Sequence, residues 1–287
     1  MSRPHLRWIL MLLMLMTGSF AYGANCTIKA TGVNFGNYNT AVRKVVGTVT
    51  VTCTKNVSYA IALNQGLGTG ATVTNRSMKS GSNVLGYGLY TNAARSINWG
   101  DSAGTNWVTG RGTGRARKHN IYAEVPAKEY SNVATYSDTI TASVQGAGFK
   151  TANASFAVKA NMLAHCILSA APLVFGSYTG VVNNATTSID VTCTNQTSYT
   201  VGLSQGKSSR ATVTKRAMTG PAGTLLHYGL YSDSGHTLNW GDTAATNWVS
   251  GAGAGGKQSL TVYGQIPGGQ FPRPGNYSDT IIAKITY

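Results

Sequence analysis

The chain contains one domain-sized sequence twice. Cys26 and Cys53 recur as Cys166 and Cys193, 140 positions further on. The motifs between and after them recur in the same order: FGNY and FGSY, VTCT twice, YGLY twice, NWGD twice and YSDTI twice. A repeat of this length is too long for a solenoid unit and has the size of a whole domain. The sequence therefore predicts two tandem domains of one fold.

Each copy has the residue pattern of an all-β domain. The segments YAIALNQG and YTVGLSQG alternate apolar and polar residues and then end in a glycine turn. Other segments, such as VVGTVTVTC and LTVYGQI, are rich in β-branched and aromatic residues, and Gly, Asn, Ser and Thr separate them. No convincing helical periodicity follows residue 24. Many short strands with Gly-rich turns predict two β-sandwiches.

The first 23 residues have the features of an export signal. Arg3 and Arg7 lie before the apolar run 8–16, which is too short to span a bilayer but suits the hydrophobic part of a signal peptide. Small residues around Gly23 suit cleavage after that position. We expect a signal peptide at 1–23 and export of the remainder.

The net charge is strongly positive, at +15 for the whole chain. Without Arg3 and Arg7, 21 of the 23 basic residues remain against 8 acidic ones. Such a charge suits nucleic acid, an anionic surface or simple solubility. For an exported chain, nucleic acid is the least expected of these partners.

The four cysteines are an even number in a chain expected to enter an oxidising compartment, which favours disulfides over metal ligands. The natural pairing is Cys26 with Cys53 and Cys166 with Cys193, one bridge in each copy. Closing a loop of that length stabilises a fold by about 3.6 kcal/mol in the chain-entropy model. Pairing between the copies remains open but would make them inequivalent.

The ordered motifs Cys…FGxY…VTC…RxM…YGLY…NWGD…YSDT resemble the spore coat protein U domain, which also forms the pilins of archaic, Csu-type chaperone–usher pili. The resemblance implies immunoglobulin-like sandwiches, the second without its last strand. In that family a periplasmic chaperone holds the groove open, an outer-membrane usher assembles the fibre, and the neighbouring pilin donates the missing strand. Two-domain members resemble the tip adhesin, which has an N-terminal tip domain and a C-terminal pilin domain.

The segment before Cys166 alternates apolar and polar residues, so it is predicted to be a strand with one apolar face that can add to the edge of a sheet. That face carries Phe156, Val158, Ala160 and Met162. The sequence leaves open whether this segment fills the first domain or begins the second. We place the tip domain at 24–150 and the pilin domain at 151–287.

The two ends of the expected mature chain suggest its place in a fibre. Only Ala24 and Asn25 precede Cys26, whereas the second YSDT is followed at once by the last residues up to Tyr287. We therefore expect the first domain to donate no strand and to lie at the end of the polymer. We expect the second domain to leave a sheet edge that another chain fills.

The copies differ most in the segment 110–120, where the first copy has GRGTGRARKHN and the second has GAGAGGKQSLT. The first copy carries Arg111, Arg115, Arg117 and Lys118 there. We predict that this loop contacts an anionic or abiotic surface at the fibre tip. The alternative is a solvated loop whose charges only keep the protein soluble.

No motif of catalysis or metal binding has the context that its chemistry needs. Gly202–Gly206 matches G-x-S-x-G, but no helix follows and Asn64 stands where the second copy has Ser204. The histidines lack metal-ligand spacing. The repeated tryptophans favour a packing role. We therefore predict no enzyme activity, no catalytic or metal site and no cofactor.

The favoured interpretation is an exported adhesive pilus subunit that passes through the periplasm to the fibre tip and supports surface attachment and biofilm formation. One alternative is a secreted coat or matrix protein, or a free-standing binding module, with two self-contained sandwiches. Another is a sugar-binding module or hydrolase, for which no converging carboxylate pair is evident.

Overall fold

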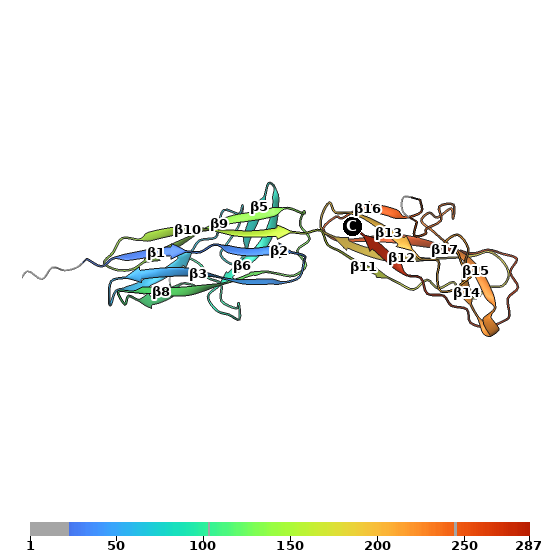
Figure 1. The fold of residues 1–287 in the computed structure, drawn as a ribbon, viewed down its shortest axis with the longest axis horizontal. Helices are drawn as coiled ribbons and strands as arrows, with labels where there is room; N and C mark the ends of the chain where they lie inside the picture. The colour runs from blue at the N-terminus through green and yellow to red at the C-terminus, as the bar shows by residue number, and fades with distance from the viewer. Residues whose placement is uncertain (1–22, 103, 244–245) are drawn as a thin grey trace, which may run out of the picture.

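Two β-sandwiches lie end to end in the computed structural model (Figure 1). It describes residues 23–102, 104–243 and 246–287. The expected signal peptide lies outside the described residues except for Gly23. Within the described ranges, no helix has the length and apolar character needed to cross a bilayer. The all-β fold predicted from the sequence is confirmed.

The first sandwich is built from ten strands. They are β1 (Cys26–Ala30), β2 (Val33–Tyr38), β3 (Arg43–Cys53), β4 (Ser58–Leu63), β5 (Arg76–Ser80), β6 (Asn83–Tyr90), β7 (Val108–Arg111), β8 (Ala116–Val125), β9 (Thr135–Gln145) and β10 (Ala152–Met162). One layer has the order β1-β3-β8-β6-β5, and the other has the order β7-β4-β9-β10-β2. Strand β5 also pairs with β9 and joins the layers at one edge.

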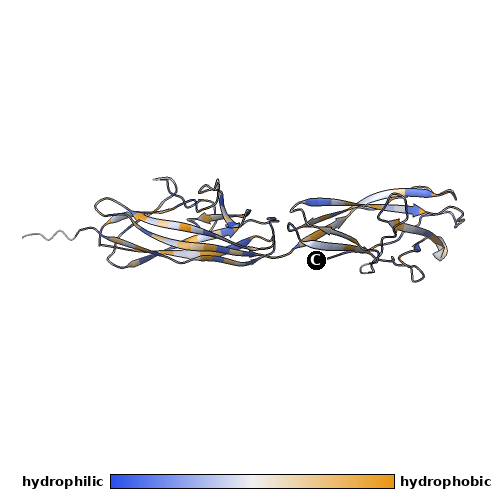
Figure 2. Ribbon diagram, turned by 90° about the horizontal axis from the view of Figure 1, so that it is seen from above, coloured by the Kyte–Doolittle hydropathy of each residue, from blue (hydrophilic) through white to orange (hydrophobic). Residues whose placement is uncertain are grey.

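The period-two pattern of the strands builds the core of the first sandwich. Along β9, Tyr136, Ile140, Ala142 and Val144 face inward and are fully buried, while their neighbours face solvent or are half-buried. Alternation of this kind is expected where one face of a sheet packs against a second sheet. Figure 2 shows apolar residues along the strands of this domain.

The second sandwich repeats most of this plan. Its strands are β11 (Cys166–Ala170), β12 (Asn183–Cys193), β13 (Ser198–Leu203), β14 (Arg216–Thr219), β15 (Leu225–Tyr231), β16 (Val249–Ala252), β17 (Lys257–Ile266) and β18 (Ala283–Thr286), with a short 3₁₀ turn, η1 (Pro221–Gly223). One layer has the order β11-β12-β17-β15-β14, and the other contains only β16-β13-β18. In the described part of this domain, no strands correspond to β2 and β10.

Each domain has one disulfide that joins its first strand to the neighbouring strand. Cys26 bonds to Cys53, and Cys166 bonds to Cys193, with Cα atoms 4.1 Å apart in both pairs. Each pair is also in register in the ladder, so the bond adds a covalent link to strands that are already paired.

The segment 151–163, which the sequence left unassigned, belongs to the first sandwich. Strand β10 pairs antiparallel with β9 and parallel with β2. The structure thus places β10 in the sheet of the first sandwich, whereas the predicted boundary after residue 150 assigns this segment to the second domain. The two sandwiches meet instead in the segment 163–165, between β10 and β11.

Candidate functional site

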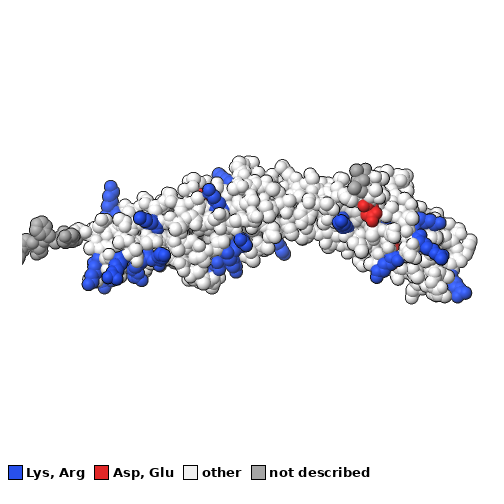
Figure 3. All heavy atoms as spheres, viewed as in Figure 1, with Lys and Arg blue, Asp and Glu red and all other residues white. Residues whose placement is uncertain are grey.

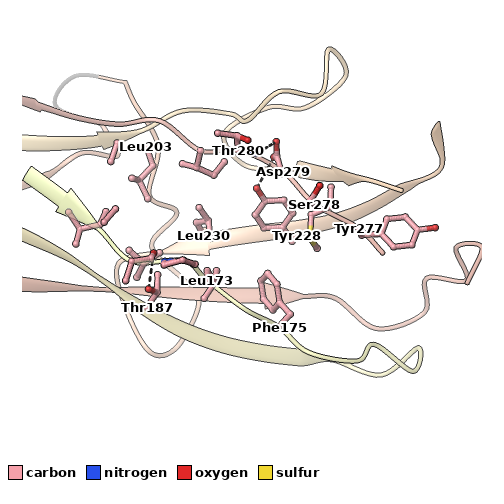
Figure 4. Close-up of a pocket in the computed structure, with 18 residues that line it drawn as sticks. Leu173, Phe175, Thr187, Leu203, Tyr228, Leu230, Tyr277, Ser278, Asp279 and Thr280 are labelled. Atoms are coloured by element: carbon pink, nitrogen blue, oxygen red, sulfur yellow. Dashed lines mark hydrogen bonds between the residues drawn. The ribbon is translucent and has the colours of Figure 1, made fainter. Parts of the chain in front are cut away.

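An open groove runs along the second sandwich between the segments 170–175 and 277–283 (Figure 4). Its cavity has a volume of about 360 Å³. Most of its floor is apolar and comes from both layers. The lining includes Leu173, Phe175, Leu203, Tyr228, Leu230 and Ile281.

The first sandwich has strand β10 where the second has the groove. The inward side chains of β10 are almost completely buried, with exposed fractions of 5% for Phe156, 0% for Val158, 2% for Ala160 and 0% for Met162. The predicted donor-like residues therefore complete the core of their own chain's first domain. Among its described residues, the second domain has no strand at this place and none at the place of β2.

The walls of the groove show the effect of the missing strand. Phe35 and Ile140 are fully buried beside β10, whereas their counterparts Phe175 and Ile281 are half-buried. The counterpart of the eleven-residue strand β9 is a strand only in its last part, β18. Before β18, one isolated bridge joins Ser278 to Thr219. A sheet edge without a neighbour leaves backbone groups and apolar side chains available to an added strand.

One polar pair lies in the wall of the groove. The Tyr228 hydroxyl donates to Asp279 Oδ2 at 2.8 Å, and the backbone amide of Lys207 donates to Asp279 Oδ1 at 2.8 Å. Burial and the hydrogen bond to the carboxylate raise the pKa of Tyr228. The pair anchors the loop after β13 to the YSDT segment, so it holds one wall of the groove in place.

A buried arginine ties together the turns beneath the groove. Arg216 is fully buried and donates to the backbone carbonyls of Leu203, Ser204, Val213 and Trp240. Its counterpart Arg76 makes the same set of contacts in the first domain, and burial lowers the pKa of Arg76 to about 10. In the sequence this arginine stands out only as part of the repeated RxM motif. Its recurrence in both copies was the available signal for a structural role.

The predicted basic loop lies at the end of the first domain that points away from the second (Figure 3). Arg111, Arg115, Arg117 and Lys118 are all exposed there. Arg111 donates to the carbonyl of Asn56, and Arg117 donates to the carbonyl of Arg111. The fold thus brings the four predicted residues together on β7, β8 and the turn between them.

Three further lysines extend this basic end, and their distance from residues 110–120 along the chain gave no signal that they would lie there. Lys29 of β1 and Lys118 of β8 lie on either side of β3, because both are paired with Thr50 of that strand. Lys55 belongs to the turn after β3, which bonds to the loop after β7. Lys150 lies in the turn between β9 and β10, and Gly148 of this turn lies close to Ala24. Among the described residues, the ion pairs join Lys44 and Arg95 to Glu124, and Lys257 to Asp190. None of these pairs includes a residue of the basic end.

The groups set aside as chemistry have structural contacts. The Ser204 hydroxyl accepts a hydrogen bond from the amide of Ile282, as Asn64 does from Thr141 in the first domain. Trp99 and Trp240 are buried and donate to backbone carbonyls of β4 and β13. Across the described ranges, no group of three or more His, Cys, Asp or Glu side chains could hold a metal.

The sequence profile of the spore coat protein U domain matches residues 13–143 and again 152–284. The chain belongs to the spore coat protein U domain family. Both copies of the internal repeat are therefore spore coat U domains, and the resemblance found in the motifs is confirmed. A curated relative, Protein U of Myxococcus xanthus, is 36% identical over 121 residues, which are 40% of this chain and 67% of the relative.

The two spore coat U domains together have the fold of a solved pilus subunit. The structure is the chaperone–tip adhesion subunit pre-assembly complex of archaic chaperone–usher Csu pili from Acinetobacter baumannii. The alignment covers 92% of this chain and 100% of that one, with a TM-score of 0.56 and 14% sequence identity. At this level of identity the likeness to the pilus subunit concerns the fold.

Proposed function

We propose that this protein is an exported, adhesive subunit of a chaperone–usher pilus and that its second domain accepts an extended strand from a neighbouring pilin. One observation carries the proposal. The second domain has an open apolar groove at the place where strand β10 completes the first domain. The fold shared with a chaperone-bound tip adhesion subunit supports a periplasmic chaperone as the partner before assembly and an usher during it.

The first domain supplies a template for the strand that the groove accepts. In its ladder, Phe156 is paired with Ile140, Val158 with Asp138 and Ala160 with Tyr136. The corresponding wall residues in the second domain are Ile281, Asp279 and Tyr277. The donated strand therefore runs antiparallel to the segment 277–286 and places alternate apolar side chains opposite these three residues.

The first domain is the surface-binding part in this proposal. Its free end gathers seven basic side chains, and the second domain has an uncharged residue at each position with a counterpart. A cluster of one sign at the end of an elongated molecule attracts anionic material. The protein would thus attach the pilus tip to an anionic or abiotic surface outside the cell and support biofilm formation.

Binding of a synthetic strand tests the groove directly. The peptide copies residues 152–163, and the mature chain is heated with and without it. We expect the peptide to raise the melting temperature of the second domain by about 10 °C or more, because it buries four apolar side chains. The matched control peptide has Val158→Asp and should have no effect.

A mature chain that is monomeric, stable and indifferent to both peptides would exclude strand acceptance. In that case the protein would have two self-contained sandwiches, and the coat-protein or free-standing binding-module interpretation would replace this proposal.

A further inference from the structure

The junction between the two domains has a specific geometry. We call the segment 126–134 the tail loop of the first domain, and the turns 194–197 and 253–256 the head turns of the second. The backbone amide of Asn195 donates to the carbonyl of Tyr130 at 2.9 Å, and its side-chain amide donates to Asn132 Oδ1 at 2.7 Å. Gly255 lies so close that a Cβ there would be 3.1 Å from the Tyr130 carbonyl oxygen. The head turns therefore dock on the tail loop by direct contact.

The second domain has its own tail loop, at 267–275, and this one is free. Phe271 stands at the position of Tyr130 and is 90% exposed, whereas Tyr130 is half-buried. The turn before β12 lies against this loop, because the Gly269 amide donates to the Gly180 carbonyl at 2.8 Å. That turn adds the exposed side chains of Val181 and Val182. A large aromatic side chain exposed beside two valines is typical of an interaction surface.

The link between β10 and β11 is short, and its length limits where the head turns of a strand-donating subunit can lie. Strand β10 leaves the first sandwich at Met162, whose amide donates to the carbonyl of Ala134 in the tail loop. Only the three residues 163–165 then separate it from β11, a link that spans little more than about 10 Å. A strand that fills the second groove in the same register leaves it beside Gly275, the counterpart of Ala134. If a similarly short link joins the donated strand to the donating subunit, the head turns of that subunit lie next to the free tail loop.

We propose that the free tail loop, with Phe271, Arg273, Val181 and Val182, is a docking face for the head turns of the neighbouring subunit. This inference rests on the proposed strand acceptance. It adds a second contact, outside the groove, between the two subunits. The junction inside this chain shows the form of that contact.

The charges at this face favour a different subunit over a second copy of this chain. In the internal junction, Asn195 bonds to Asn132. Arg273 replaces Asn132 in the free tail loop, and Lys55 replaces Asn195 in the head turns of the first domain. Docking a second copy would bring two cations together where the internal junction has a hydrogen bond, which is unfavourable. The neighbouring subunit should instead have an asparagine or a carboxylate facing Arg273.

The test uses the full chain equipped with its own donor strand. Residues 151–165 are placed directly before Cys26, so that each molecule can fill the second groove of another. We expect head-to-tail oligomers whose half-life in denaturant is measured by size-exclusion chromatography. Lys55→Asn should lengthen this half-life about threefold, because it removes the like charge facing Arg273.

Phe271→Ser, added to Lys55→Asn, should shorten the half-life about tenfold. The matched control is Leu238→Ser, which alters another exposed apolar side chain of the same domain (62% exposed) and should change nothing. The isolated 152–163 peptide has no head turns, so Phe271→Ser should leave its affinity unchanged.

The outcomes separate the two proposals. Absence of any oligomer would exclude strand acceptance itself. If oligomers form but neither Lys55→Asn nor Phe271→Ser changes their half-life, strand acceptance stands and the docking face is overturned. Equal weakening of peptide and oligomer by Phe271→Ser would also overturn it, because the substitution would then act on the groove.

Discussion

Tyr228 donates to Asp279 at 2.8 Å in the wall of the open groove, and Tyr87 donates to Asp138 at 2.5 Å in the same place beside β10. The pair is therefore formed whether or not a strand fills the groove. Gly206 makes room for it, since a Cβ at this residue would lie 2.0 Å from the Asp279 carboxylate. The wall is preorganised, so strand binding does not have to build it.

The first prediction concerns alkaline pH. Burial and the hydrogen bond to Asp279 raise the pKa of Tyr228 in the folded domain. Above pH 10 the unfolded chain loses this proton while the folded chain keeps it, so stability falls as the pH rises. We expect the free energy of unfolding to decrease between pH 9 and pH 12, and Tyr228→Phe to reduce this decrease. Denaturant unfolding across that range, with Tyr263→Phe as the control, measures the effect.

The second prediction concerns the buried arginine. Arg216→Met leaves the backbone carbonyls of Leu203, Ser204, Val213 and Trp240 without their shared donor. We expect the free energy of unfolding of the peptide-filled second domain to fall by about 3 kcal/mol or more. Arg210→Met, on the surface, is the matched control. A loss below 1 kcal/mol would show that water replaces the guanidinium.

The third prediction concerns the basic end. The second domain supplies neutral replacements at the corresponding positions, which are Arg111→Ala, Arg115→Gly, Arg117→Gln and Lys118→Ser. We expect this variant to bind anionic beads less tightly and with a weaker dependence on salt, because fewer charges contribute. The donor peptide should raise the melting temperature of this variant as much as that of the unchanged protein.

The control for the basic end removes the same number of charges from the second domain. The residues changed to glutamine are Lys207, Arg210, Lys215 and Lys284. Equal loss of bead binding in both variants would assign the effect to net charge and would contradict a specific basic end.

The fourth prediction concerns the register of the donated strand. In the first domain Phe156 is paired with Ile140, whose counterpart in the groove is Ile281. A donor peptide with Phe156→Cys should form a disulfide with an Ile281→Cys chain. A peptide with Val158→Cys should react much more slowly, because its cysteine faces Asp279. The reverse preference would mean a shifted register, with the groove still accepting a strand.

The fifth prediction concerns the disulfides. Thiol titration of the denatured, unreduced chain should find no free cysteine. Replacing Cys166 and Cys193 together by alanine should destabilise the second domain by about 3.6 kcal/mol. Two or more free thiols in the unreduced chain would contradict the bonds seen between β1 and β3 and between β11 and β12.

Much of the fold follows from the sequence because its signals are local or repeated. Period-two alternation reports which residues of a strand share a face, and cysteines repeated at one offset indicate one bridge per copy. The repeated YSDT and RxM motifs marked positions that matter in both domains, without showing that Asp279 bonds to Tyr228 or that Arg216 is buried. Those partners are far apart in the chain, and only the fold brings them together.

The sequence by itself determined that there are two copies of one all-β domain and that residues 152–162 form a strand with one apolar face. Only the tertiary structure decided that this strand completes the first sandwich and that the second has a groove in its place. It also decided that Lys29, Lys55 and Lys150 join the basic loop at one end. The physical reason is that alternation specifies the face of a strand but not its neighbour, which is set by packing between segments distant in sequence.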